Sequence, residues 1–529
     1  MKTRFNSVLR ASVIVFVFLV AAKLLNFFKK ILIGNLFGVS SVADAFFAAS
    51  FLPHYLGIFF EGILFLGFLP LFSQIMAEKG KEEAHQFLSE IFFLILFLTT
   101  LLALLGGALA PWVIRQLVPG FTSAEQDLTR SLFQILSLVL IFITLTAFFK
   151  ALNSYFEHYA WAASSALIDS IVMIGVTLIA WRQWGIYGAA WGAVMGVLSA
   201  FILQAAFLFR KHSILPSHFL SRKPEMLQLF YFLIPMGIIW VFQQIPLVIL
   251  NRFGSGMWEG TISSLTIAQT LTTVPMGFVN HTVLFAVFPS LAKQANENGA
   301  DNLKETFFQT LRGGFFILIP AGFLLTAFAR PLTALFFSGG GIAEEGTQRI
   351  ANSLVCFGWA TFALYADLFM TQSLIAIRKP LPAIFLCASR AFLTYAVGYF
   401  LSTYWDYQGL ALSFSLALLI NFFLLFPLFF RLSPFQDHWK GLLGYSLKLI
   451  LASSPLFLVG WFVNQWPIGA WIAYPKTFVV GGLFLGVLLG IAFYVFFLSR
   501  LKVGELDSVL RQLKEGWMRK SWWLAEQSE

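Results

Sequence analysis

The sequence predicts an all-α polytopic membrane protein of about fourteen transmembrane helices, built as two pseudo-symmetric six-helix lobes plus two C-terminal helices. Composition, long apolar segments and an internal repeat support this prediction. Of the 529 residues, 59% are hydrophobic and 11% are charged, and the mean hydropathy is +0.80. Because a soluble domain could not bury so much apolar surface, the composition excludes a soluble protein.

Long apolar segments define the predicted helices, each with the roughly 20 to 30 residues that a bilayer requires. We expect these helices near 8–35, 42–74, 89–115, 130–155, 158–181, 185–210, 227–252, 261–292, 306–335, 348–376, 380–402, 407–431, 443–464 and 472–499.

Several motifs recur about 220 residues further along the chain, which indicates a duplicated bundle. The matched features are Pro53 with Pro275, Pro70 with Pro289, Pro111 with Pro331, and the segment 184–188 with the segment 405–409. Each unit contains an even number of predicted spans, so both lobes should point the same way. Duplicated bundles of this kind are typical of alternating-access transporters.

The repeat divides the chain into four predicted parts. Residues 1–215 form the N-terminal lobe and residues 225–432 form the C-terminal lobe. The two extra helices lie within 443–499. Residues 500–529 form a basic amphipathic tail, which either lies on the membrane surface or is simply solvated.

Loop charge predicts the orientation. Lys and Arg are concentrated in the loops on the side of the N-terminus, and the positive-inside rule places both termini in the cytoplasm. The net charge of +10 is therefore ascribed to topology. No basic module with interleaved aromatic residues indicates a nucleic-acid partner.

The first predicted helix carries an unusual polar stripe. Lys23, Asn26 and Lys30 share one face, and Lys29 lies beside them. An ammonium at membrane depth costs about 2.5–3.5 kcal/mol even on lenient scales, so these residues should face a wet cavity. Lys29 and Lys30 could alternatively snorkel to the interface.

Two carboxylates occupy the second predicted helix. Asp44 is interpreted as the N-cap of its own helix, because it opens a long apolar run. Glu61 lies deeper and is predicted to pair with Lys23 or Lys30. Burial of Glu61 in its neutral form is the competing interpretation.

Other polar residues inside apolar segments have less specific interpretations. Arg390 should pair with Asp367 or Asp169, or act as a fixed internal cation in the second lobe. His54 and His281 are expected to be packing residues rather than ligands.

Pro53 and Pro275 fall inside long helices, where each removes a backbone hydrogen bond and favours a kink. Equivalent kinks in both lobes would let the helices flex as gates, although static kinks that only assist packing remain an alternative. Cys356 and Cys387 lie in apolar segments and indicate packing, not a disulfide framework.

No catalytic constellation, metal-binding cluster or nucleotide-binding loop is found in the sequence, so we expect neither an enzyme nor a cofactor. Without a nucleotide site, transport would be driven by an ion gradient, by the membrane potential or by downstream consumption of the substrate.

Local motifs resemble one transporter family. These are Phe37-Gly38-Val39, Ala43-Asp44-Ala45-Phe46-Phe47, Leu52-Pro53, Phe60-Glu61-Gly62, Phe68-Leu69-Pro70, Ala151-Leu152-Asn153-Ser154 and Val274-Pro275-Met276-Gly277. Together they resemble the MurJ (MviN) lipid II flippase family of the multidrug/oligosaccharidyl-lipid/polysaccharide exporter superfamily.

The resemblance implies a flippase of the bacterial cytoplasmic membrane that moves lipid II, an undecaprenyl-diphosphate-linked peptidoglycan precursor, to the outer leaflet by alternating access. The last two helices would form a groove for the lipid tail. Envelope-synthesis proteins and membrane lipids would be partners. A diphosphate requires fixed cations in the cavity, which agrees with the lysine stripe.

The expected headgroup site contains Lys23, Asn26, Lys29, Lys30, Glu61 and Gln269. Lys23, Lys29 and Gln269 stand where the family has arginine, and the segment 55–58 carries no cation. A flippase for another polyprenyl-linked oligosaccharide therefore stays open. A multidrug or cation antiporter, whose cargo the lysines would repel, and a non-transporting scaffold are further alternatives. Some relatives bind sodium in the second lobe, where Arg390 could replace the ion.

Overall fold

The computed structural model describes residues 2–212, 224–286, 300–337, 341–377, 379–425, 439–501 and 503–505. Its helices are α1 Lys2–Phe37, α2 Ser41–Ile63, η1 Leu64–Phe68, α3 Leu69–Glu78, α4 Lys81–Ala108, α5 Ala110–Leu117, α6 Ser123–Tyr155, α7 Tyr159–Trp184, α8 Ile186–His212, α9 Pro224–Gly254, α10 Thr261–Ala286, α12 Ala300–Ala327, α13 Ala329–Phe337, α14 Glu344–Gly358, α15 Thr361–Ala376, α16 Pro380–Ile420, η2 Asn421–Leu425, α18 Trp439–Asn464, α19 Ile468–Ala473 and α20 Lys476–Arg500.

The all-α membrane fold is confirmed. Eleven helices of the described ranges are long and apolar enough to cross a bilayer, or twelve if α14 and α15, bent by 54°, form one span. One of the eleven, Pro380–Leu424, covers two predicted spans. Helix α1 covers the first predicted span and is not among the eleven. With α1, the bent pair and the helix that covers two spans, the structure is compatible with about fourteen transmembrane spans.

Helix α2 begins at a side-chain cap and ends in a widened turn. The Oγ atom of Ser40 accepts a hydrogen bond from the backbone N–H of Ala43. The π-helical turn η1 follows α2, immediately before Pro70 in the first turn of α3. Because proline lacks an N–H and crowds the preceding turn, the wider turn accommodates it without ending the span.

The internal repeat is visible in the backbone. Gly185, between α7 and α8, has φ 54° and ψ −133°, and Asp406, at the break within α16, has φ 50° and ψ −136°. In the first hairpin Gly188 packs closely against Ala180, eight positions earlier in the chain. In the second, Gly409 packs in the same way against Leu401, also eight positions earlier. The two hairpins thus repeat one conformation, as their matched spacing predicts.

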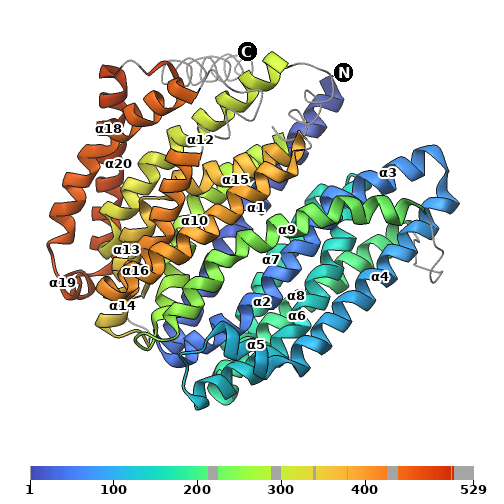
Figure 1. Ribbon diagram of the computed structural model, residues 1–529, viewed down its shortest axis with the longest axis horizontal. Coiled ribbons are helices and arrows are strands. Elements are labelled where there is room, and N and C mark those ends of the chain that lie inside the picture. The colour runs from blue at the N-terminus through green and yellow to red at the C-terminus, as the bar shows by residue number, and fades with distance from the viewer. Residues whose placement is uncertain are drawn as a thin grey trace, which may run out of the picture.

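Figure 1 shows the arrangement of the helices. Helices α2 to α8 lie together on one side, and α10, α12 and α14 to α16 lie on the other. Helix α1 packs against both α7 and α10, whereas α9 packs mainly against α16. Helix α18 covers α12, and α20 covers α18. A large apolar core includes residues from both groups.

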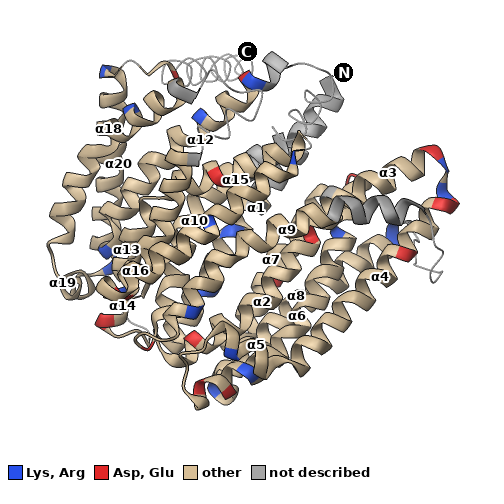
Figure 2. Cartoon of the chain, viewed as in Figure 1, with Lys and Arg blue, Asp and Glu red and all other residues tan. Residues whose placement is uncertain are grey.

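The start of α1 and the end of α20 lie at the same end of the molecule (Figure 1). The lobe boundaries at 215 and 225–432, the lipid-tail groove and the cytoplasmic location of the termini stay predictions. Pro289 and most of the predicted amphipathic tail, residues 506–529, lie outside the described residues. Charged side chains are sparse along the helices and more frequent near their ends (Figure 2).

Candidate functional site

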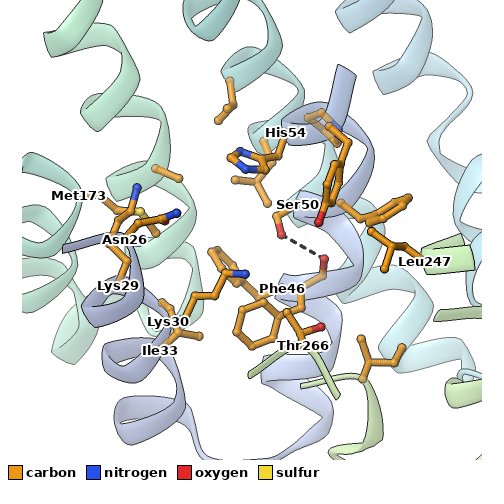
Figure 3. A pocket seen from close by; sticks show the side chains of 18 of the residues that line it. Asn26, Lys29, Lys30, Ile33, Phe46, Ser50, His54, Met173, Leu247 and Thr266 are labelled. Atoms are coloured by element: carbon orange, nitrogen blue, oxygen red, sulfur yellow. Dashed lines mark hydrogen bonds between the residues drawn. The ribbon is translucent and has the colours of Figure 1, made fainter. Parts of the chain in front are cut away.

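A cavity of about 200 Å³ lies where α1 meets both groups of helices. Helices α1, α2, α6, α7, α8, α9 and α10 all contribute to its wall. Its polar lining residues are Asn26, Lys29, Lys30, Ser50, His54, Asp169, Asn251, Thr266 and Gln269. Figure 3 shows several of these side chains converging on the cavity from α1 and α2.

The two adjacent lysines of α1 bind different sides of the cavity. The Nζ atom of Lys29 lies 2.7 Å from Oδ2 of Asp169 on α7. The Nζ atom of Lys30 donates a 2.7 Å hydrogen bond to Oγ1 of Thr270 on α10. Successive helix residues point about 100° apart, which lets neighbouring lysines reach opposite helices. Lys29 is therefore neutralised by a carboxylate, whereas the bonded partner of Lys30 is neutral.

Four of the six predicted headgroup residues line this cavity: Asn26, Lys29, Lys30 and Gln269. Snorkelling of Lys29 and Lys30 to the interface does not occur. Lys23 lies elsewhere on α1, where its Nζ would be 3.7 Å from a Cβ added at Gly277.

The predicted pairing of Glu61 was wrong. Its Oε1 atom lies 2.5 Å from Nζ of Lys150 on α6. Lys150 lies within α6, where its side chain is only partly exposed and lies over the ring of Phe65. Lys23 lies within the electrostatic range of both Glu61 and Lys150, but it forms no ion pair with Glu61. Among the described residues, neither Lys23 nor Glu61 lines the cavity.

Asp44 does not cap its own helix, because Ser40 does so. The Asp44 carboxylate is buried, with 3% of its surface exposed, and it accepts hydrogen bonds from two backbone N–H groups at the start of α10. The donors are Gly260, 2.9 Å from Oδ2, and Ser263, 2.6 Å from Oδ1. Asp44 therefore caps the repeat counterpart of its own helix.

A second cap runs in the reverse direction. The Oε1 atom of Glu259, just before α10, accepts a 2.9 Å hydrogen bond from the backbone N–H of Ser41 at the start of α2. This bond holds the pKa of Glu259 below its usual value, because it stabilises the carboxylate. Arg349 donates a 2.6 Å hydrogen bond to the backbone carbonyl of Glu259. We call this exchange of caps between α2 and α10 the reciprocal cap.

Further contacts join the two groups of helices at this end. Arg252 donates a 2.7 Å hydrogen bond to the carbonyl of Gln116, and Ser255 Oγ accepts a 3.1 Å bond from the N–H of Gly120. A Cβ added at Gly120 would lie 2.4 Å from the Cα of Gly256. Only glycine permits so close a backbone approach. By the predicted topology this is the outer end, and it is closed.

The two prolines lie inside helices as predicted. Pro53 is buried in α2 and lines the cavity, and Pro275 lies in α10. Their role as gates stays a prediction, as does the alternative of static kinks.

Arg390 forms a buried cluster in the second group of helices, remote from the cavity lining. Its NH1 group binds Oδ2 of Asp367, as one of the alternatives predicted. Asn421 donates a 3.0 Å hydrogen bond to Oδ1 of Asp367, and Arg390 NH2 donates a 3.0 Å bond to the carbonyl of Gln243. The cluster thus links α9, α15, α16 and η2.

His54 lines the cavity and is exposed there (Figure 3), and its expected role as a packing residue rather than a ligand stays a prediction. The side chain of His281 lies outside the described part. Sequence reasoning also missed Glu259 and Lys150. It considered Asp169, a charged residue inside an apolar segment, as a partner of Arg390, whereas the structure pairs Asp169 with Lys29. Nothing in the sequence signals that the loop residue Glu259 crosses to the other repeat.

The sequence matches the profile of one known protein family. The sequence profile described as "Lipid II flippase MurJ" matches residues 33–489. The chain belongs to this family. A "Probable lipid II flippase MurJ" of Buchnera aphidicola subsp. Schizaphis graminum is 26% identical over 88% of the chain and 92% of the relative. One from Rhizobium tropici is 25% identical over 93% of the chain and 94% of the relative.

Two solved structures show the same fold. "Lipid II flippase MurJ, inward closed conformation" matches with a TM-score of 0.74 and 20% identity, over 94% of the chain and all of that structure. An inward-facing multidrug resistance MATE transporter of the MOP superfamily matches with a TM-score of 0.65 and 15% identity. This match covers 76% of the chain and 92% of that structure. The predicted resemblance is thereby confirmed.

Proposed function

We propose that this protein moves lipid II from the cytoplasmic to the outer leaflet of the bacterial cytoplasmic membrane by alternating access. Membership in the MurJ family and the cationic cavity between the repeats support this function. The decisive observation is the placement of Lys29 and Lys30 on one wall, bound to helices of opposite repeats.

The cavity chemistry suits a diphosphate headgroup. Ammonium groups attract phosphate oxygens strongly at membrane depth, where water screens charge weakly. Asn26, Gln269 and Thr266 supply further hydrogen-bonding groups for sugar or peptide atoms. A cavity with a lysine bound only to a hydroxyl repels cationic drugs, which argues against a multidrug antiporter.

Alternating access follows from the contacts at the closed end. The reciprocal cap and the Gly120–Gly256 approach hold α2 and α10 together. If water molecules replaced the hydrogen bonds of the reciprocal cap, the two repeats could separate at this end. The lipid tail can remain in the bilayer throughout, because only the headgroup needs the cavity. The membrane potential or an ion gradient supplies the driving force in this proposal.

Complementation tests the function. Cells depleted of their own lipid II flippase should survive with the wild-type protein and expose lipid II outside. Lys30→Ala should reduce that exposure at least about tenfold, since a charged hydrogen bond contributes about 1.5–3 kcal/mol. Lys476→Ala, at the exposed start of α20, is the matched control and should rescue fully.

Two other outcomes would change the assignment. Failure of a membrane-inserted wild-type protein to rescue would favour another polyprenyl-linked oligosaccharide as cargo. Full rescue by Lys30→Ala would remove Lys30 from the headgroup site.

A further inference from the structure

His54 is a titratable residue in the cavity that the proposed mechanism does not yet use. It follows Pro53 on α2, and its ring points into the cavity on the side of Asn26 and Lys29 (Figure 3). The ring is exposed to the cavity although the residue lies at membrane depth. Within the described ranges, its nitrogen atoms form no hydrogen bond, so they are free to bind a ligand.

The charges that line the cavity around His54 nearly cancel. Lys29 and Lys30 face it from α1, and Asp169 faces it from α7. Asp169 neutralises Lys29 through their 2.7 Å ion pair, whereas Lys30 contacts only a hydroxyl. With a neutral His54, the lining therefore carries one uncompensated positive charge.

Of the charges beyond the lining, Glu61 lies within electrostatic range of His54, and Lys23 lies within that of Lys30. On α2 itself, Glu61 is paired with Lys150 of α6, and Asp44 is bound to the start of α10. Helices α8, α9 and α10 place only uncharged side chains in the lining. Lys23 of α1 lies against Gly277, outside the lining.

A diphosphate headgroup would upset this balance. Each phosphate of a diester carries about one negative charge, so a lipid-linked diphosphate carries about two. One uncompensated lysine leaves a negative charge without a partner in a poorly screened site, which is costly. Histidine is the side chain that gains a proton most readily near neutral pH.

We propose that His54 takes up a proton when the diphosphate binds and becomes the second cation of the headgroup site. This proposal rests on the proposed function and adds to it a residue that contacts the substrate. The proton comes from the water that fills the site, and it leaves when the headgroup leaves. The protonated ring donates a charge-assisted hydrogen bond to a phosphate oxygen, which a neutral amide cannot replace.

The sign of the pH dependence follows. Binding should be tight at low pH, where His54 charges readily, and should weaken as pH rises. The loss of one charged hydrogen bond predicts about a tenfold fall in affinity between about pH 6 and about pH 8.

Calorimetry with the full chain in lipid nanodiscs tests the proposal, with lipid II as the probe, because its diphosphate is a diester that does not titrate near neutral pH. Titrations at one pH in buffers of different ionisation enthalpy count the protons taken up. The wild type should take up a fraction of one proton near neutral pH. His54→Gln should bind about tenfold more weakly at low pH, take up none and show a flat pH profile. His85→Gln, near the start of α4, is the matched control and should behave as the wild type.

The outcomes separate the two proposals. Absence of probe binding by the folded wild type at every pH would overturn the lipid-linked diphosphate as cargo. Binding without proton uptake, or uptake that persists in His54→Gln, would overturn the role of His54 alone. If His54→Gln and His54→Asn both fail to fold, nitrogen NMR of labelled histidine in the wild type reads the ring directly. A His54 signal unchanged by the probe would then contradict the proposal.

Discussion

At the scale of single residues, the backbone of the second repeat is strained at Asp406. Asp406 and Gly185 share a backbone conformation with positive φ that favours glycine. A side chain held there costs about 1–3 kcal/mol. The second repeat has the same turn as the first but carries aspartate where the first carries glycine.

Replacement of Asp406 by glycine should therefore stabilise the protein. We expect Asp406→Gly to raise the free energy of unfolding by about 1 kcal/mol, measured by SDS titration in mixed micelles. The counterpart Gly185→Asp should lower it by a similar amount. A loss of stability in Asp406→Gly would show that the aspartate side chain contributes more than the backbone costs.

Arg390 makes a second prediction at this scale. Arg390→Met leaves the buried Asp367 carboxylate without its cation, which should cost about 3–5 kcal/mol in the same titration. The double variant Arg390→Met/Asp367→Asn should recover most of that loss, since Asn421 can still donate to the amide oxygen. Equal loss in the single and double variants would contradict this account.

The same cluster bears on ion coupling. If Arg390 serves as the internal cation, flipping by wild-type proteoliposomes should be equal in sodium and choline buffers. A sodium requirement would contradict that role.

At the scale of helices, the reciprocal cap joins the counterpart helices α2 and α10. Glu259→Gln should weaken it, because a neutral amide accepts a weaker hydrogen bond than a carboxylate. The expected result is several-fold faster labelling of Ser50→Cys by a thiol reagent added outside, in a background without Cys356 and Cys387. Glu125→Gln is the matched control, since Glu125 caps only its own helix.

The cap also predicts a pH dependence with a definite sign. The pKa of Glu259 is lower in this closed state than in water, so the stabilisation it provides is present at neutral pH. It is lost as pH falls through the lowered pKa. The labelling rate of Ser50→Cys, divided by that of a free thiol at the same pH, should therefore rise in acid when Glu259 is present, and Glu259→Gln should show no such rise. An acid response that persists in Glu259→Gln would assign it to another group.

These elements show what the sequence could predict. Apolar length and matched prolines predicted the spans and the repeat, because both follow from the bilayer and the backbone. Helix periodicity placed Asn26 and Lys30 correctly on a cavity face. The partners of Asp44 and Glu61 were missed, because a pairing between distant helices depends on packing angles that local spacing does not encode.

At the scale of the whole molecule, transport requires that the two repeats separate at the end they now close. Gly120 and Gly256 allow backbone contact there, and Gly120 also donates to Ser255. Gly120 permits the closed state because it has no side chain, whereas a Cβ added at Gly256 would make only an ordinary contact with the carbonyl of Phe253.

A bulky residue at this contact should therefore shift the conformational equilibrium. Gly120→Val should prevent full closure, because even its Cβ would lie 2.4 Å from the Cα of Gly256. We expect labelling of Ser50→Cys from outside to rise and complementation to fall at least about tenfold, since a two-state equilibrium moves tenfold for each 1.4 kcal/mol of clash. Gly107→Val is the matched control, because a Cβ there meets open space. Unchanged labelling and full rescue by Gly120→Val would mean that closure at this end is not part of the transport cycle.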